Sequence, residues 1–164
     1  MRQAVNAQVL RAIGWHESRL RGNAVAHNRN GTRDLGAFQI NTVHLPELAR
    51  FGVGPTLLHD TCAAAHVAAW HYARQVARHG NTWRAVGAYH SGTPARAAWY
   101  ANAIAGVLMR WGILPAAALP YPVAHTLAPF HTAPPSDDAA DHPPITVLDA
   151  GAASPLPPTP EPPP

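Results

Sequence analysis

The chain has 164 residues, enough for one domain of ordinary size with its own hydrophobic core. It contains 12 basic and 9 acidic side chains, and every basic one is arginine. No apolar run approaches the roughly 18 residues of a membrane-spanning helix. Cys62 is the only cysteine, which excludes an internal disulfide and a cysteine-based zinc site.

Proline and charge divide the chain into two parts. Three of the 18 prolines lie in residues 1–112, and fifteen lie after them. All 12 arginines and four acids precede residue 113, so residues 1–112 carry a net charge of +8 and residues 113–164 a charge of −5. The second part is rich in Pro and Ala and cannot bury a core. We predict a folded domain over residues 1–112 and a disordered tail over residues 113–164.

The first half of the domain combines helical and irregular patterns. Apolar spacing predicts a helix over residues 2–18. The Asn- and Gly-rich stretch 22–34 predicts an irregular loop or a small hairpin, and residues 35–41 are compatible with an extended segment. A short helix is expected over residues 42–51, ending at Gly52.

The second half of the domain is predicted to be helical. The longest helix is expected over residues 61–79, with Asp60 or Thr61 available as its cap and Gly80 as its stop. A shorter helix is expected over residues 82–89, and a last one over residues 94–111. The predicted fold is therefore mostly α, with one short irregular or β insertion.

Glu17 is the most suggestive residue chemically. It is expected on a largely apolar face at the C-terminal end of the first helix. Desolvation and the negative end of the helix dipole both raise the pKa of a carboxyl there. A carboxyl that stays protonated near neutral pH can act as a general acid. The alternative is an exposed glutamate in a fraying last turn, which the spacing alone favours.

Three strings, in order, resemble motifs of the lytic transglycosylase catalytic domain. AIGWHESRL, GAFQIN and GNTWRAVGAYHSG are similar to its ES, GLMQIN and AYNAG motifs. HLPELARFG also has a counterpart in the small transglycosylases of type III and IV secretion, conjugation and pilus systems. The resemblance covers about residues 3–112. It implies a lysozyme-like fold that acts on peptidoglycan.

The resemblance also implies roles for individual residues. Glu17 matches the single catalytic acid and base, which protonates the glycosidic oxygen between N-acetylmuramic acid and N-acetylglucosamine. The same group then helps the 6-hydroxyl close a 1,6-anhydro ring, so one carboxylate replaces the usual pair. Gln39 and Tyr89 match residues of the substrate cleft. His90 stands where the family usually has asparagine, and it can still donate and accept hydrogen bonds.

Asp34 is a second carboxylate, 17 residues after Glu17 and just before the segment that carries Gln39. TRDLGAFQIN resembles a motif of animal c-type lysozymes that carries the second carboxylate of a hydrolase. Alternatively, Asp34 accepts hydrogen bonds from backbone N–H groups of a turn. We predict it as a cleft residue and leave its role open.

Metal and nucleic-acid ligands are less favoured. The 11 histidines form no HExxH motif, and His66 and His71 lie five residues apart, so we expect no metal and no cofactor. The arginines could serve a nucleic-acid binder. A solvated face that favours an anionic cell wall is the preferred interpretation, so we expect no nucleic-acid partner.

The sequence thus predicts a peptidoglycan lytic transglycosylase. Its expected task, in the periplasm or at the wall, is to open the wall locally for a secretion, conjugation or pilus apparatus. The alternatives are a muramidase, a catalytically weak wall-binding assembly factor, and an arginine-driven nucleic-acid binder.

The N-terminus as given shows no export signal. Members of the family generally begin earlier, with such a signal and a cysteine whose partner lies at the position of Cys62. We therefore expect a start further upstream, a degraded copy, or export by the apparatus itself. In this chain Cys62 is expected to be a free, mostly buried thiol.

Overall fold

The structure is a computed structural model that describes residues 5–116 and 119–122. In the described part, five α-helices, two short 3-10 helices and three short strands follow one another along the chain. They are α1 (Ala7–Ser18), β1 (Val25–His27), β2 (Arg33–Leu35), β3 (Ile40–Asn41), η1 (Thr42–His44), α2 (Leu45–Ala49), η2 (Pro55–His59), α3 (Thr61–His79), α4 (Trp83–His90) and α5 (Pro94–Arg110). This composition confirms the mostly helical, lysozyme-like fold.

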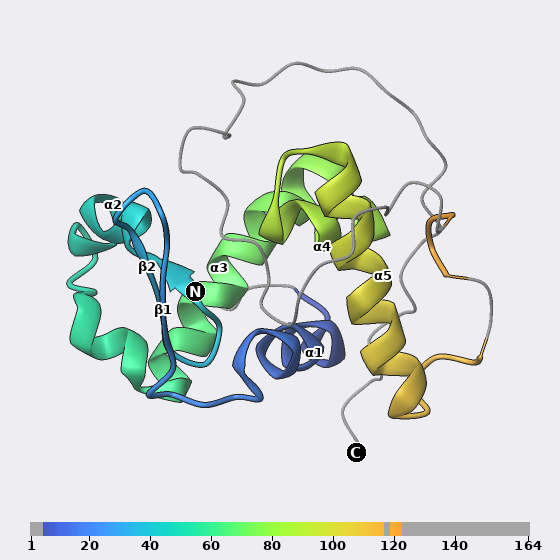
Figure 1. Cartoon of the computed structure of the whole chain (residues 1–164), viewed down its shortest axis with the longest axis horizontal. Helices are drawn as coiled ribbons and strands as arrows, with labels where there is room; N and C mark the ends of the chain where they lie inside the picture. Colours follow the sequence, from blue (N-terminus) through green and yellow to red (C-terminus); the bar gives the residue numbers. More distant parts are fainter. Residues whose placement is uncertain (1–4, 117–118, 123–164) are drawn as a thin grey trace.

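The small sheet and the helices occupy different ends of the domain. In Figure 1 the sheet and α2 lie at one end, α4 and α5 lie at the other, and α1 and α3 lie between them. The strands are antiparallel in the order β1-β2-β3, and Asp34 on the central strand pairs with Ala26 on one side and Asn41 on the other. Of the two alternatives for residues 22–34, an irregular loop or a small hairpin, the structure contains the hairpin, which extends to Leu35.

A polar cap sets the start of α1. The Asn6 side-chain oxygen accepts hydrogen bonds from the N–H groups of Gln8 (3.0 Å) and Val9 (3.2 Å), so the helix begins at Ala7. Val5 and Asn6, which the prediction placed inside this helix, lie before it, so the predicted start is wrong there. Residues 2–4 lie outside the described residues.

The boundaries of α3 agree with the prediction. Asp60 Oδ1 accepts a 2.7 Å hydrogen bond from the Ala63 N–H, and Gly80, at φ +71°, follows the last helical residue. Cys62 is a free thiol and lies exposed in the first turn of this helix. The prediction that its thiol is buried is wrong, because the apolar side of α3 enters the core only from Ala64 onward.

The core joins α1, α3, α4 and α5. Its largest fully buried side chains include Ile13, Tyr72, Tyr100, Ile104 and Leu108. At the contact of α4 with α5, a Cβ atom at Gly87 would collide with the backbone oxygen of Ala97, so only glycine permits this close approach. This packing fixes α5 against α1, beside the end of the helix that carries Glu17.

Described residues beyond 112 also contact the domain. Ile113, Leu114 and Tyr121 pack against the core. The side-chain amide of Asn102 donates to the Tyr121 carbonyl and accepts from the Tyr121 N–H, both at 3.0 Å. Residues 117–118 and 123–164 lie outside the described residues, so the disorder of the tail stays a prediction.

No helix among the described residues combines the length and the apolar character needed to cross a bilayer.

Candidate active site

Glu17 lies half-buried in the last turn of α1. Its Oε1 accepts a 2.6 Å hydrogen bond from the hydroxyl of Tyr100 on α5. Burial raises the pKa of Glu17 to about 7, the hydrogen bond from Tyr100 opposes this rise, and the nearby charge of Asp34 adds to it. The exposed, fraying glutamate that spacing favoured is therefore not what the structure contains. This carboxyl is half-protonated near neutral pH and can release or accept a proton there.

Ser18 joins the end of α1 to the segment that follows β2. Its hydroxyl donates to the carbonyl oxygen of Ala37 (2.9 Å) and accepts from the Arg21 N–H (2.9 Å). The chain then leaves the helix through two residues with left-handed backbones, Arg19 at φ 59° and Leu20 at φ 61°. These contacts hold Glu17 beside the segment that carries Gln39.

A tight turn over residues 36–39 presents Gln39. The turn requires glycine at position 36 for two reasons: its φ is +74°, and a Cβ atom there would collide with the backbone oxygen of Leu58. Gln39 is itself left-handed, at φ 47°, and its side-chain amide donates to the Gly36 carbonyl (2.8 Å). The Tyr89 hydroxyl donates to the carbonyl of Phe38 at 3.3 Å, which ties α4 to the same turn.

Asp34 is held by side-chain amides. Its Oδ1 accepts from Asn41 at 2.8 Å and its Oδ2 accepts from Asn28 at 3.1 Å. The same two amides donate to the hydroxyl of Thr32, at 3.1 Å and 2.9 Å respectively. Burial raises the pKa of Asp34, and the two amide hydrogen bonds oppose that rise. In place of the backbone N–H groups considered as one alternative, the two asparagine side chains hold this carboxylate.

Tyr100 is a site residue that sequence reasoning missed. It is separated from Glu17 by 83 positions, and its ring is fully buried. The rings of His90 (4.7 Å between centroids, 3° between planes) and Tyr89 (6.3 Å, 19°) stack on it, and His16 meets it edge to face at 5.3 Å. Burial and the adjacent Glu17 charge raise the pKa of Tyr100 well above its usual range, so its hydroxyl remains a donor.

Two imidazoles beside Tyr100 are neutral at ordinary pH. Burial lowers the pKa of His16 and of His90 to about 4 in each case. The Nε2 atom of His90 is buried and finds no hydrogen-bond partner among the described residues. The structure thus places His90 against the ring of Tyr100.

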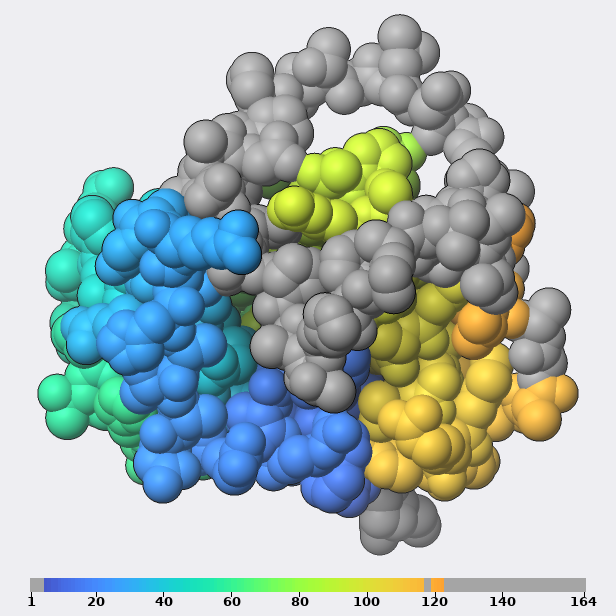
Figure 2. Space-filling model, in the orientation of Figure 1, coloured from blue at the N-terminus to red at the C-terminus, as the bar shows by residue number. Residues whose placement is uncertain are grey.

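The elements bring the five predicted site residues toward one region. Glu17 ends α1, Asp34 and Gln39 flank the Gly36 turn, and Tyr89 and His90 end α4. In the space-filling view of Figure 2, α1 lies between the hairpin segment and α5. The described residues contain no group of three or more His, Cys, Asp or Glu side chains placed to hold a metal ion.

Comparison with known proteins identifies the family of the chain. The model of the transglycosylase SLT domain family matches residues 1–106. The chain therefore belongs to the SLT transglycosylase domain family.

Individual relatives match a shorter stretch. Invasion protein IagB of Salmonella typhimurium is 38% identical over 90 residues, which cover 54% of this chain and 56% of IagB. X polypeptide of Escherichia coli is 39% identical over 89 residues, covering 54% and 53% respectively. Protein IpgF of Shigella flexneri is 36% identical over 93 residues, covering 56% and 61%. The chain thus spans little more than half the length of these relatives.

Proposed function

We propose that this chain is a peptidoglycan lytic transglycosylase in which Glu17 is both acid and base. The observation that carries the proposal is the environment of Glu17, a carboxyl with a pKa near 7 whose Oε1 is held by Tyr100. A general acid works best when its pKa lies close to the operating pH. Membership of the SLT transglycosylase domain family supports the same assignment.

Glu17 transfers a proton in each of the two steps of the proposed reaction, first as the acid and then as the base. Because Tyr100 donates to Oε1, Oε2 carries the proton and gives it to the glycosidic oxygen. The bond between that oxygen and C1 of the muramoyl residue breaks, and N-acetylglucosamine leaves with a 4-hydroxyl group. The ionised Glu17 then takes the proton of the 6-hydroxyl of the same muramoyl residue. The 6-oxygen bonds to C1, which closes the 1,6-anhydro ring and returns Glu17 to its protonated form. No water is consumed.

Asp34 is a substrate-binding residue of the cleft in this proposal and not a nucleophile. Each of its carboxylate oxygens already accepts a hydrogen bond from an asparagine amide, and burial disfavours its charge. A nucleophile or an ion-pair partner for the sugar needs a charged oxygen that faces C1. The muramidase alternative rests on one observation, that Asp34 lies close enough to raise the pKa of Glu17.

The remaining predicted residues complete the cleft in this proposal. Gln39 is half-buried on a turn fixed by Gly36, which presents its amide at a defined place. Tyr89 and His90 shape the wall of the cleft through their packing on Tyr100. We assign Gln39, Tyr89, His90 and Asp34 to substrate binding and Glu17 to catalysis.

The proposed setting is the bacterial wall, in the periplasm or at the wall itself. The name of IagB identifies it as an invasion protein. Local cleavage of glycan strands would open a passage for a secretion, conjugation or pilus apparatus. Net positive charge in the folded domain suits a wall that carries negative charge.

Two amide substitutions test the proposal. Glu17→Gln should lower the rate of muropeptide release from purified peptidoglycan by about 10²- to 10⁴-fold, because an amide of the same shape cannot donate the proton. Asp34→Asn should lose far less. Glu47→Gln is the matched control, since Glu47 pairs with Arg74 at the surface. An Asp34→Asn loss as large as that of Glu17→Gln would favour the muramidase. Wall binding without cleavage by the wild type would favour the assembly factor.

A further inference from the structure

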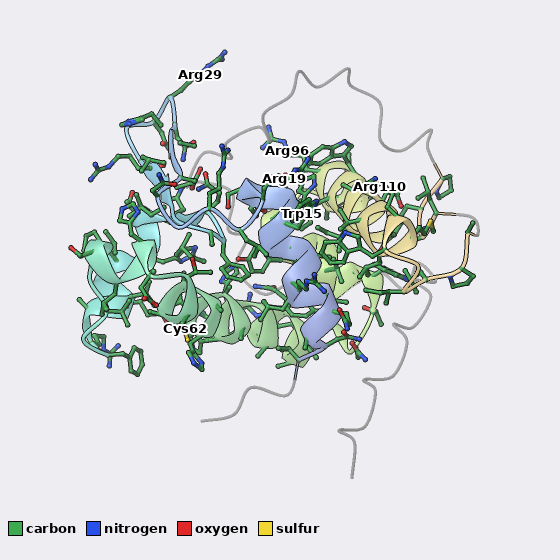
Figure 3. All side chains as sticks on the ribbon, turned by 90° about the horizontal axis from the view of Figure 1, so that it is seen from below. Trp15, Arg19, Arg29, Cys62, Arg96 and Arg110 are labelled. Atoms are coloured by element: carbon green, nitrogen blue, oxygen red, sulfur yellow. The ribbon has the colours of Figure 1, made fainter. Side chains whose placement is uncertain are left out.

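Exposed arginines surround exposed Trp15 and half-buried Trp111 at one face of α1 and at the end of α5. We call Arg11, Trp15, Arg19, Arg110 and Trp111 the Arg–Trp surface. The guanidinium of Arg11 lies 4.7 Å from the ring of Trp111, Trp111 meets Trp15 edge to face at 5.9 Å, and Arg19 lies 5.4 Å from the ring of Trp15. Figure 3 labels Trp15 on α1, Arg19 directly after that helix and Arg110 at the end of α5.

The Arg–Trp surface carries positive charge that no carboxylate of the described residues balances. The described residues contain four acids. Glu47 pairs with Arg74, Asp60 caps α3, and Glu17 and Asp34 belong to the site already described. Cation–π contact with the indole rings holds the guanidinium groups of Arg11 and Arg19, and Arg19 Nη1 also donates to the Trp15 carbonyl (2.8 Å). The remaining N–H groups of these exposed side chains are available to a ligand.

This surface adjoins the site through His16. Arg19 and Arg110 lie close enough to His16 that their charges lower the pKa of its imidazole. The ring of His16 packs edge to face on Tyr100, and Tyr100 bonds to Glu17. Arg19 also follows Glu17 by two residues, at the same end of α1, so substituents of a glycan strand bound at Glu17 can reach the Arg–Trp surface.

We propose that the Arg–Trp surface binds the carboxylates of the peptide stems carried by the glycan strand in the active site, an inference that rests on the proposed function. Stem peptides project from muramoyl residues and carry several carboxylates. Arginine forks bind carboxylates with two parallel hydrogen bonds, and indole faces take up the apolar parts of a peptide. The protein thereby selects glycan strands with intact stems over strands stripped of them.

Binding by the full chain with Glu17→Gln tests this selection without turnover. The probes are labelled muropeptide oligomers with intact stems and the same oligomers after an amidase has removed the stems. The intact probe should bind more tightly than the stripped one. Arg19→Glu with Arg110→Glu should reduce that preference by about tenfold, which corresponds to about 1.4 kcal/mol, because two attractions for carboxylates become repulsions.

The matched control replaces two exposed arginines elsewhere, Arg29→Glu with Arg50→Glu, and changes the net charge by the same amount. Figure 3 shows Arg29 far from Arg19 and Arg110. The control pair should leave the preference within about twofold of its starting value. Equal effects of the two pairs would overturn the inference, as would equal binding of intact and stripped oligomers by the parent protein.

Duplex DNA and anionic lipid vesicles are the competing ligands. If Arg19→Glu with Arg110→Glu weakens binding to either of these and leaves the intact oligomer unaffected, the inference is overturned. The test is separable from the proposed function. Wild-type lysis of peptidoglycan together with no preference for stems contradicts only this inference, whereas a preference for stems together with no lysis contradicts only the catalytic proposal.

Discussion

Replacing Glu17 by Gln should stabilise the protein, and by an amount that depends on pH. Burial raises the pKa of Glu17 from 4.5 to about 7 in the folded state. The folded protein therefore holds a proton that the unfolded chain has lost, so the wild type loses stability as pH rises from about 4.5 to about 7. A shift of this size corresponds to about 3 kcal/mol. The glutamine of the Glu17→Gln protein has no charge to bury, so this variant escapes that loss.

Urea unfolding of both proteins at pH 4, 6 and 8 measures this difference. The stability advantage of the Glu17→Gln protein should grow by about 3 kcal/mol between pH 4 and pH 8. Glu47→Gln is the control, because Glu47 and Arg74 are 43% and 39% exposed and such pairs contribute about 0–1 kcal/mol. An advantage that is independent of pH, or that shrinks as pH rises, would refute the assignment of Glu17 as a buried carboxyl with a raised pKa.

Three further outcomes follow from the contacts of the site. Tyr100→Phe removes a hydrogen bond worth about 1.5–3 kcal/mol to the charged carboxylate of Glu17, which raises the pKa of Glu17 and should move the alkaline limb of the pH–activity profile up by about 1–2 pH units. Tyr72→Phe, the control, removes a buried hydroxyl that has no partner in the described part and should not move that limb. Gly36→Ala should destabilise the fold by more than about 3 kcal/mol in thermal melting, whereas Gly31→Ala, at a similar φ but in open space, should cost about 1 kcal/mol. Native Cys62 should react with a thiol reagent about as fast as the denatured chain, and strong protection would contradict its exposed position.

Local signals accounted for most of the helical architecture. Asp60 and Gly80 mark the ends of α3 through a cap and a left-handed stop, and both signals lie within a few residues of what they control. The start of α1 was wrong because the apolar spacing continues upstream of Ala7, and the hydrogen bonds of Asn6 outweigh it. The prediction that Cys62 is buried was wrong for a related reason. Periodicity assigns a residue to a helix face but does not tell where along that face the core begins.

The site depended on contacts between distant parts of the chain. The string that contains Glu17 pointed to the carboxyl, but the group that holds it, Tyr100, comes from a helix 83 positions away. Its role follows from how α5 packs on α1, which no spacing in the sequence shows. The partners of Asp34 were missed for a similar reason, because Asn28 and Asn41 reach it across strand pairs.

Digestion of purified peptidoglycan in water labelled with oxygen-18 tests the central claim most directly. If Glu17 alone carries both proton transfers, mass spectrometry should find muropeptides that end in 1,6-anhydromuramic acid, lack one water relative to reducing-end products and contain no oxygen-18. Glu17→Gln should release these products about 10²- to 10⁴-fold more slowly. If Asp34 and water complete the reaction instead, the products should carry reducing ends with one oxygen-18 atom at C1. Labelled reducing ends as the main product of the wild type would contradict the transglycosylase assignment.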